Sequence, residues 1–162
     1  NQGRHPRESR AHFFALRAVM PDQKGYMLLD SDNRGLPDHE ISAEGLVVSR
    51  WRRYEAENYL LHPDALLRFI DKHAGPLFVE PARKFLEDEL PGAVRRNPLE
   101  DHEYLESVPA SKSIIPRLLK IAQLPLGKRS YHLIAEQMCP EEIAAEVKMK
   151  LDEIHSIIES KG

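Results

Sequence analysis

The sequence predicts a helix-dominated α/β fold, in which a small parallel sheet is followed by a mostly α-helical extension. Two short apolar runs, at 26–29 and 46–48, have the length expected of buried strands. Beyond Trp51, apolar residues recur at helical spacing almost to the end of the chain. The 162 residues suffice for about one domain. We divide them into an α/β segment over 1–62 and a helical extension over 63–162 packed on it.

The α/β segment is predicted to contain one helix and two strands. The helix covers 8–20, with apolar residues at one helical face: Ala11, Phe14, Ala15, Ala18 and Val19. The strands cover 24–30 and 45–51, and the first is apolar enough to be buried on both faces, as in a parallel sheet. Two strands alone form a marginal sheet, so we expect neighbouring strands upstream of Asn1. The absence of an initiator Met agrees with a piece of a longer protein.

The helical extension is predicted from proline positions and apolar spacing. Pro63 opens the first helix, and a second helix containing Phe85 ends before Pro91. Residues 95–110 read as a loop with a short helix, and helices are expected over 114–124 and 131–138. The last helix begins at Pro140 and carries one apolar stripe, which serves either the core or a dimer interface: Ile143, Val147, Leu151, Ile154 and Ile158.

Composition narrows the possible functions. Hydrophobic residues make up 41% and charged residues 30%, ordinary values for a globular chain. The net charge of −3 argues against a strongly basic nucleic-acid module but is compatible with a local basic patch. Cys139 is the single cysteine, which excludes a disulfide within the chain and favours a cytoplasmic setting. No apolar run approaches the ~20 residues of a membrane span, so we expect no membrane partner.

Two carboxylates follow the first strand. Asp30 and Asp32 are two residues apart, so in extended chain they face the same side, at the end of a sheet where ligands commonly bind. Paired carboxylates repel each other unless a cation lies between them, and oxygen ligands favour Mg²⁺ or Mn²⁺. The alternative is a simple turn, because Asp, Asn and Gly are common turn residues. A calcium loop is excluded because Arg34 and Ile41 occupy two of its ligand positions.

A second polar segment follows the second strand. Glu55 and Glu57 lie there beside a basic cluster. The acids are either a solvated first helical turn or part of a metal site. The arginines Arg50, Arg52 and Arg53 are either surface charge or contacts to a phosphodiester. The segment also contains the aromatic residues Trp51, Tyr54 and Tyr59. A role in the core is favoured for them over stacking on the bases of a nucleic acid.

These two segments resemble the toprim (topoisomerase–primase) domain. The residues that carry the resemblance are Asp30-x-Asp32 after an apolar strand and the run Tyr54-Glu55-Ala56-Glu57-Asn58-Tyr59-Leu60-Leu61. They are most similar to the domain as fused to ATPases of the overcoming-lysogenisation-defect (OLD) type and related bacterial phage-defence proteins. The resemblance implies that Asp30, Asp32 and Glu57 bind Mg²⁺ or Mn²⁺. It also implies that Lys128, in Gly127-Lys128-Arg129, faces the scissile phosphate.

The sequence departs from that pattern in two ways. No acidic residue ends a strand before Asp30, where the family has its first motif. Gly127-Lys128 is not a phosphate loop, since position 122 is Ala and Arg129 stands where Ser or Thr is required. Both departures predict the later part of a toprim domain with its helical extension, belonging to a larger ATPase, so that ATP enters only through an upstream domain.

The leading hypothesis is therefore a metal-dependent nuclease region acting on DNA or RNA. Glu55 is expected to hold a second ion or orient water, and Lys128 to stabilise phosphate charge. The predicted nucleic-acid contacts are Arg50, Arg52, Arg53 and Arg129. The isolated chain is expected to be inactive. The alternative is a non-catalytic scaffold that forms a homodimer or binds a partner. The eight histidines show no zinc-motif spacing, and His62 is expected in a packing or surface role.

Overall fold

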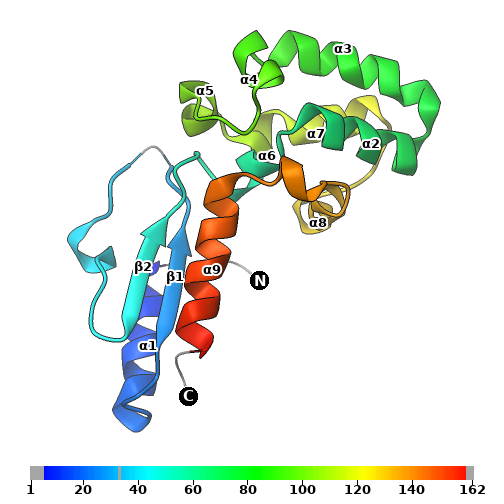
Figure 1. Cartoon of the computed structure of the whole chain (residues 1–162). Helices are drawn as coiled ribbons and strands as arrows, with labels where there is room; N and C mark the ends of the chain where they lie inside the picture. Colours follow the sequence, from blue (N-terminus) through cyan, green and yellow to red (C-terminus); the bar gives the residue numbers. More distant parts are fainter. Residues whose placement is uncertain (1–5, 33, 160–162) are drawn as a thin grey trace.

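The fold class predicted from the sequence is confirmed: the chain is helix-dominated with a small parallel sheet (Figure 1). The computed structural model describes residues 6–32 and 34–159. The α/β layer consists of α1 (Pro6–Val19), β1 (Gly25–Leu29), β2 (Leu46–Arg50) and the C-terminal α9 (Ala145–Glu159). The helical unit between β2 and α9 contains α2 (Pro63–Ala74), α3 (Val79–Glu89), α4 (Gly92–Arg96), α5 (Glu103–Ser107), α6 (Ala110–Ser113), α7 (Ile115–Ile121) and α8 (His132–Ala135).

The two strands of the sheet run parallel, in a register that pairs Gly25 with Leu46 and Leu29 with Arg50. Phe13 of α1 packs against the sheet and forms a small core with Leu46 and Val48. Gly25 permits this close approach, because a Cβ there would lie 2.7 Å from the Phe13 ring. In Figure 1, α1 covers one face of the sheet and α9 lies along β1.

The prediction of which face of the first helix is buried is wrong. The structure buries Phe13, whereas Val19 is 83% exposed and Phe14 is also exposed. The face of α1 that meets the rest of the chain is partly polar: Arg10 donates to the carbonyl of Ile41, and Arg17 donates to the carbonyl of Glu44. A sheet of two strands covers only a narrow stripe of a helix, so the apolar residues outside that stripe remain in solvent.

The main hydrophobic core lies in the helical unit. The predictions of a helix opened by Pro63 and of a helix around Phe85 are confirmed by α2 and α3. Their inward residues pack against α5 to α8. The largest side chains shielded from solvent are Leu61, Leu66, Phe69, Ile70, Leu86, Leu90, Val94, Leu105, Ile114, Ile115, Leu118 and Ile134. This core is separate from the small one beneath α1.

The apolar stripe predicted for the last helix is only partly buried. Pro140 opens a separate 3-10 turn, Pro140–Glu142, and α9 begins at Ala145. Leu151 is 59% exposed and Ile158 is 62% exposed. Ile143, Val147 and Ile154 of the stripe are half-buried. Polar side chains also meet the sheet, because Lys150 Nζ donates to Ser49 Oγ (2.5 Å) and Tyr26 donates to Glu153 (2.5 Å). In the described part of the chain, every helix is too short or too polar to cross a membrane.

A buried polar junction connects the two halves. Asn58, in the 3-10 helix Ala56–Leu60, donates through Nδ2 to the carbonyls of Leu105 (2.8 Å) and Val108 (2.9 Å). Arg53 is also buried and donates to the carbonyls of Asn58 (3.0 Å) and Pro98 (2.7 Å). Burial lowers the pKa of Arg53, against the opposing effect of nearby Tyr59 and acids. The segment after β2 is thus fastened to the part of the helical unit around α5.

We predict that Asn58→Ala destabilises the protein by on the order of 2–4 kcal/mol, because two buried carbonyls lose their donor. Asn97→Ala is the matched control, since that side chain is exposed. Urea unfolding followed by circular dichroism measures both free energies of unfolding. A change for Asn58→Ala no larger than that of the control would contradict the role of this junction.

Candidate functional site

Three predicted site residues from distant parts of the sequence come together at the carboxyl end of β1. Asp30 follows the strand directly, and its Oδ1 accepts a hydrogen bond from the backbone N–H of Ala56 (3.0 Å). Ala56 opens the 3-10 helix that carries Glu57. Lys128, in the 3-10 turn Lys128–Ser130, places Nζ 2.7 Å from Glu57 Oε1. We call Asp30, Asp32, Glu57 and Lys128 the acidic cluster.

The charges of the acidic cluster act on one another. Burial raises the pKa of Asp30, and the carboxylates of Glu57 and Asp32 raise it further. The Ala56 N–H and the Lys128 ammonium oppose this rise. The hydrogen bond to Glu57 raises the pKa of Lys128, as does the nearby charge of Asp30. The ammonium of Lys128 therefore offsets part of the negative charge of Asp30 and Glu57.

Asp32 stands apart from the other two carboxylates. It adopts a left-handed backbone conformation with φ of 46°, is exposed, and has its carboxylate 3.5 Å from Arg34. Its backbone N–H donates to the carbonyl of Tyr54 (3.0 Å), which holds the turn against the segment after β2. Within residues 6–32 and 34–159, the oxygens of Asp30, Asp32 and Glu57 do not all lie within 4.8 Å of one another.

Glu55 lies close to the acidic cluster but faces inward. Its side chain is buried, and its two oxygens accept hydrogen bonds from the backbone N–H (2.5 Å) and hydroxyl (3.0 Å) of Ser111. Glu55 thus ties the segment after β2 to α6. Because the side chain is buried, a water molecule oriented by Glu55, the role expected from the sequence, would have to enter the protein interior.

The predicted nucleic-acid-binding arginines divide into paired and unpaired side chains. Arg50 donates to Glu40 (2.8 Å) and to the carbonyl of Asp30, and Arg53 is buried in the junction. Arg52 is exposed, but it pairs with Asp101 (2.5 Å) and Glu106 (2.9 Å). Among the described residues, no partner is recorded for the exposed side chain of Arg129. Arg129 is therefore the member of this set that could bind a phosphate without first giving up an ion pair.

Of the aromatic residues near the acidic cluster, Tyr59 is buried, and Trp51 and Tyr54 are half-buried. The ring centroids of Trp51 and Tyr59 are 4.8 Å apart, and Tyr59 also receives the guanidinium of Arg53 over its ring. Burial raises the pKa of Tyr59 above its ordinary value, helped by its hydrogen bond to Glu146. This arrangement agrees with the core role favoured by the sequence.

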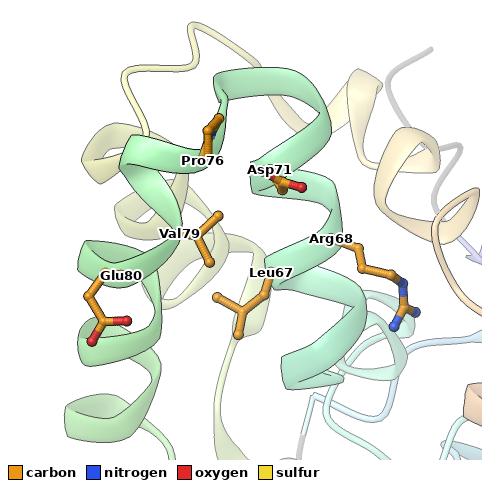
Figure 2. A pocket seen from close by; sticks show the side chains of 6 residues that line it. All are labelled: Leu67, Arg68, Asp71, Pro76, Val79 and Glu80. Atoms are coloured by element: carbon orange, nitrogen blue, oxygen red, sulfur yellow. The ribbon is translucent and has the colours of Figure 1, made fainter.

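A surface depression between α2 and α3 lies outside the acidic cluster. It is lined by Leu67, Arg68, Asp71, Pro76, Val79 and Glu80. Figure 2 shows Arg68 extending from α2 away from Pro76 and Val79, while Glu80 projects from α3 on the opposite side. Because the polar groups diverge, the depression does not have the convergent donors of a ligand site.

Sequence reasoning missed a second grouping of metal-ligating atoms. Single ligand atoms of His62, Asp64 and Glu142 all lie within 4.8 Å of one another. The sequence contains one local signal, a His-x-Asp at the start of α2, but the third residue is distant in the chain. Only the tertiary structure brings Glu142 to the other two.

No known protein family, curated protein or solved structure matches this chain.

We predict that Asp30→Asn stabilises the protein at pH 7 in the absence of divalent ions. A raised native pKa means that the native state loses stability as pH rises from the unfolded pKa, near 3.9, through the native pKa. Asn removes this penalty and retains an oxygen to accept from Ala56. After allowance for solvent screening, the gain is less than about 1 kcal/mol, or up to about 3 °C in melting temperature.

Thermal unfolding at pH 3 and pH 7 tests this prediction, because the gain should vanish at the lower pH. Asp88→Asn, at an exposed position on α3, is the matched control and should leave the melting temperature unchanged. A loss of stability in Asp30→Asn at pH 7 would contradict the predicted cost of keeping the Asp30 carboxylate charged.

Proposed function

We propose that the chain is a region of a divalent-metal-dependent nuclease, a phosphodiesterase acting on DNA or RNA. The observation that supports this is the convergence of Asp30, Glu57 and Lys128 at the carboxyl end of a parallel strand. Their close approach is not a consequence of local sequence, since β1, the segment after β2 and the turn at Lys128 contribute one residue each. Carboxylates beside an ammonium are the groups required to hold a hard cation and a phosphate together.

The residues proposed to hold Mg²⁺ or Mn²⁺ are Asp30, Asp32 and Glu57. Asp30 and Glu57 fit such an ion because the donors are oxygen and because Asp30 is partly buried beside like charges, a condition that a cation relieves. Asp32, which stands apart from them, would have to turn toward the ion to join it. A bound divalent ion supplies polarisation of a phosphoryl oxygen and a lowered pKa for water. The hydrogen bond from Ala56 fixes the orientation of Asp30.

The proposed phosphate contacts are Lys128 and Arg129. Lys128 is anchored by Glu57, and its raised pKa keeps the ammonium charged at neutral pH. Arg129 is its exposed neighbour, able to contact a phosphate without breaking an ion pair recorded among the described residues. Arg50 and Arg53 contribute by fixing the backbone around the acidic cluster, and Glu55 by fixing α6 to it.

We further propose that this region functions within a larger ATPase of the OLD type found in phage defence. Toprim-type chemistry requires an acidic motif that this sequence does not contain before Asp30. The isolated chain should accordingly cleave nucleic acid weakly or not at all. ATP would act through an upstream domain.

The proposal predicts that Asp30→Asn combined with Glu57→Gln reduces cleavage by the full-length parent at least about a hundredfold, because the ion loses two anionic ligands. Cleavage of plasmid DNA and structured RNA with Mn²⁺ is the measurement. Lys128→Ala should reduce cleavage as well, whereas Asp88→Asn should not. Unchanged cutting by the double variant, with folding verified by circular dichroism, would rule out the metal assignment.

A second candidate is a non-catalytic scaffold that forms a homodimer. It is favoured by the apolar side chains that α1 and α9 leave in solvent, among them Val19, Leu151 and Ile158. Exposed apolar residues that form a contiguous patch are typical of an interface.

In the scaffold alternative, light scattering should report a dimer, and Leu151→Glu with Ile158→Glu should shift it to a monomer. Leu77→Glu is the control, since Leu77 is equally apolar and lies exposed in the helical unit. A dimer whose melting temperature does not respond to Mn²⁺ would favour the scaffold, because a bound ion must stabilise the native state. A monomer stabilised by Mn²⁺ would favour the nuclease.

A further inference from the structure

We propose that His62, Asp64 and Glu142 form a binding site for a divalent transition-metal ion of the zinc type. The site lies where the start of α2 meets the turn that precedes α9, and it does not depend on the proposed nuclease function. One nitrogen and two carboxylate oxygens form a donor set suited to Zn²⁺, whereas Mg²⁺ favours oxygen ligands alone.

The surroundings of the His62 ring are those of a metal ligand rather than of a hydrogen-bonded side chain. Its side chain is 13% exposed, and its Nδ1 is shielded from solvent with no hydrogen-bond partner. Nδ1 lies 3.8 Å from Glu142 Oε1, too far for a hydrogen bond. Two ligands bound to zinc at about 2.0 Å with tetrahedral geometry lie about 3.3 Å apart. The observed separation is therefore closer to that of two metal ligands than to that of a hydrogen-bonded pair.

The two oxygens of Glu142 have different surroundings. Oε2 accepts hydrogen bonds from the backbone N–H of Cys139 (2.8 Å) and from the Arg68 guanidinium. Oε1 faces His62. Outer contacts of this kind orient a ligating carboxylate and leave one oxygen for the ion. Arg68 also donates to the carbonyl of Gln137 (2.8 Å), so the guanidinium is itself held in place.

The remaining ligand is accessible. Asp64 is exposed, and no hydrogen bond or ion pair of its side chain is recorded among the described residues. It lies two residues after His62, with Pro63 between them at the first position of α2. Proline restricts the backbone at this point, so the spacing of the two ligands is set before an ion binds.

The three residues supply fewer ligands than a tetrahedral zinc ion takes. Three protein ligands leave one position of a tetrahedral ion for water or another group.

The test is zinc titration of the chelator-treated chain by calorimetry at pH 7. We expect one zinc ion per chain and a rise in melting temperature of about 5–10 °C when zinc exceeds its Kd about a hundredfold. Excess Mg²⁺ should not displace the zinc. His62→Ala should weaken binding at least about tenfold, and Asp64→Asn should do the same without affecting folding, because Asp64 is exposed.

Three control variants separate this site from other zinc ligands. His155→Gln removes an exposed histidine that pairs with Glu159 (3.2 Å), and Cys139→Ser removes the free thiol. Asp88→Asn removes an exposed carboxylate of α3. All three should bind zinc like the unmodified chain. The proposal is overturned if the unmodified chain binds no zinc, if folded Asp64→Asn binds it equally well, or if a control variant loses it. Should His62→Ala fail to fold, Asp64→Asn decides.

Discussion

The fold depends on the buried polar junction formed by the segment that follows β2. Arg53, Glu55 and Asn58 are all shielded from water, and each bonds to a part of the chain at least forty residues further on or to its own segment. Buried polar groups are costly unless they are hydrogen-bonded, so the bonds that these side chains make leave the segment few alternative placements, even though Asn58 Oδ1 is itself buried without a partner among the described residues. Its position then determines where Ala56 and Glu57 lie relative to Asp30.

This constraint explains why the acidic cluster forms at the end of a sheet with only two strands. A pair of parallel strands is marginal by itself, and its own core within the described residues is small. The large core lies in the helical unit. The junction connects that core to the end of β1 through the backbone of Tyr54. The Tyr54 carbonyl accepts a hydrogen bond from the N–H of Asp32, and the Tyr54 N–H donates to the carbonyl of Leu105.

The two groupings of ligand atoms differ in the kind of cation that their surroundings favour. The acidic cluster contains oxygen donors and already includes an ammonium from Lys128. The grouping at His62 contains a buried nitrogen without a hydrogen-bond partner and a carboxylate fixed by Arg68. Both lie where the α/β layer meets the helical unit, so an ion at either would add a link between the halves of the protein.

The sequence by itself determined the elements: apolar runs gave the two parallel strands, and proline with apolar spacing gave α2 and α3. Asp30 could be selected because it is one of two carboxylates directly after an apolar strand, whereas Glu57 and Lys128 were assigned roles through the resemblance to the toprim domain. Only the tertiary structure decided which helix faces are covered, so Val19 and Leu151 are exposed and Lys150 is buried. It also decided that Arg53 and Glu55 turn inward and that Glu142 meets His62. The physical reason is that periodicity reports which residues share a face, whereas burial and pairing depend on what another part of the chain brings to that face.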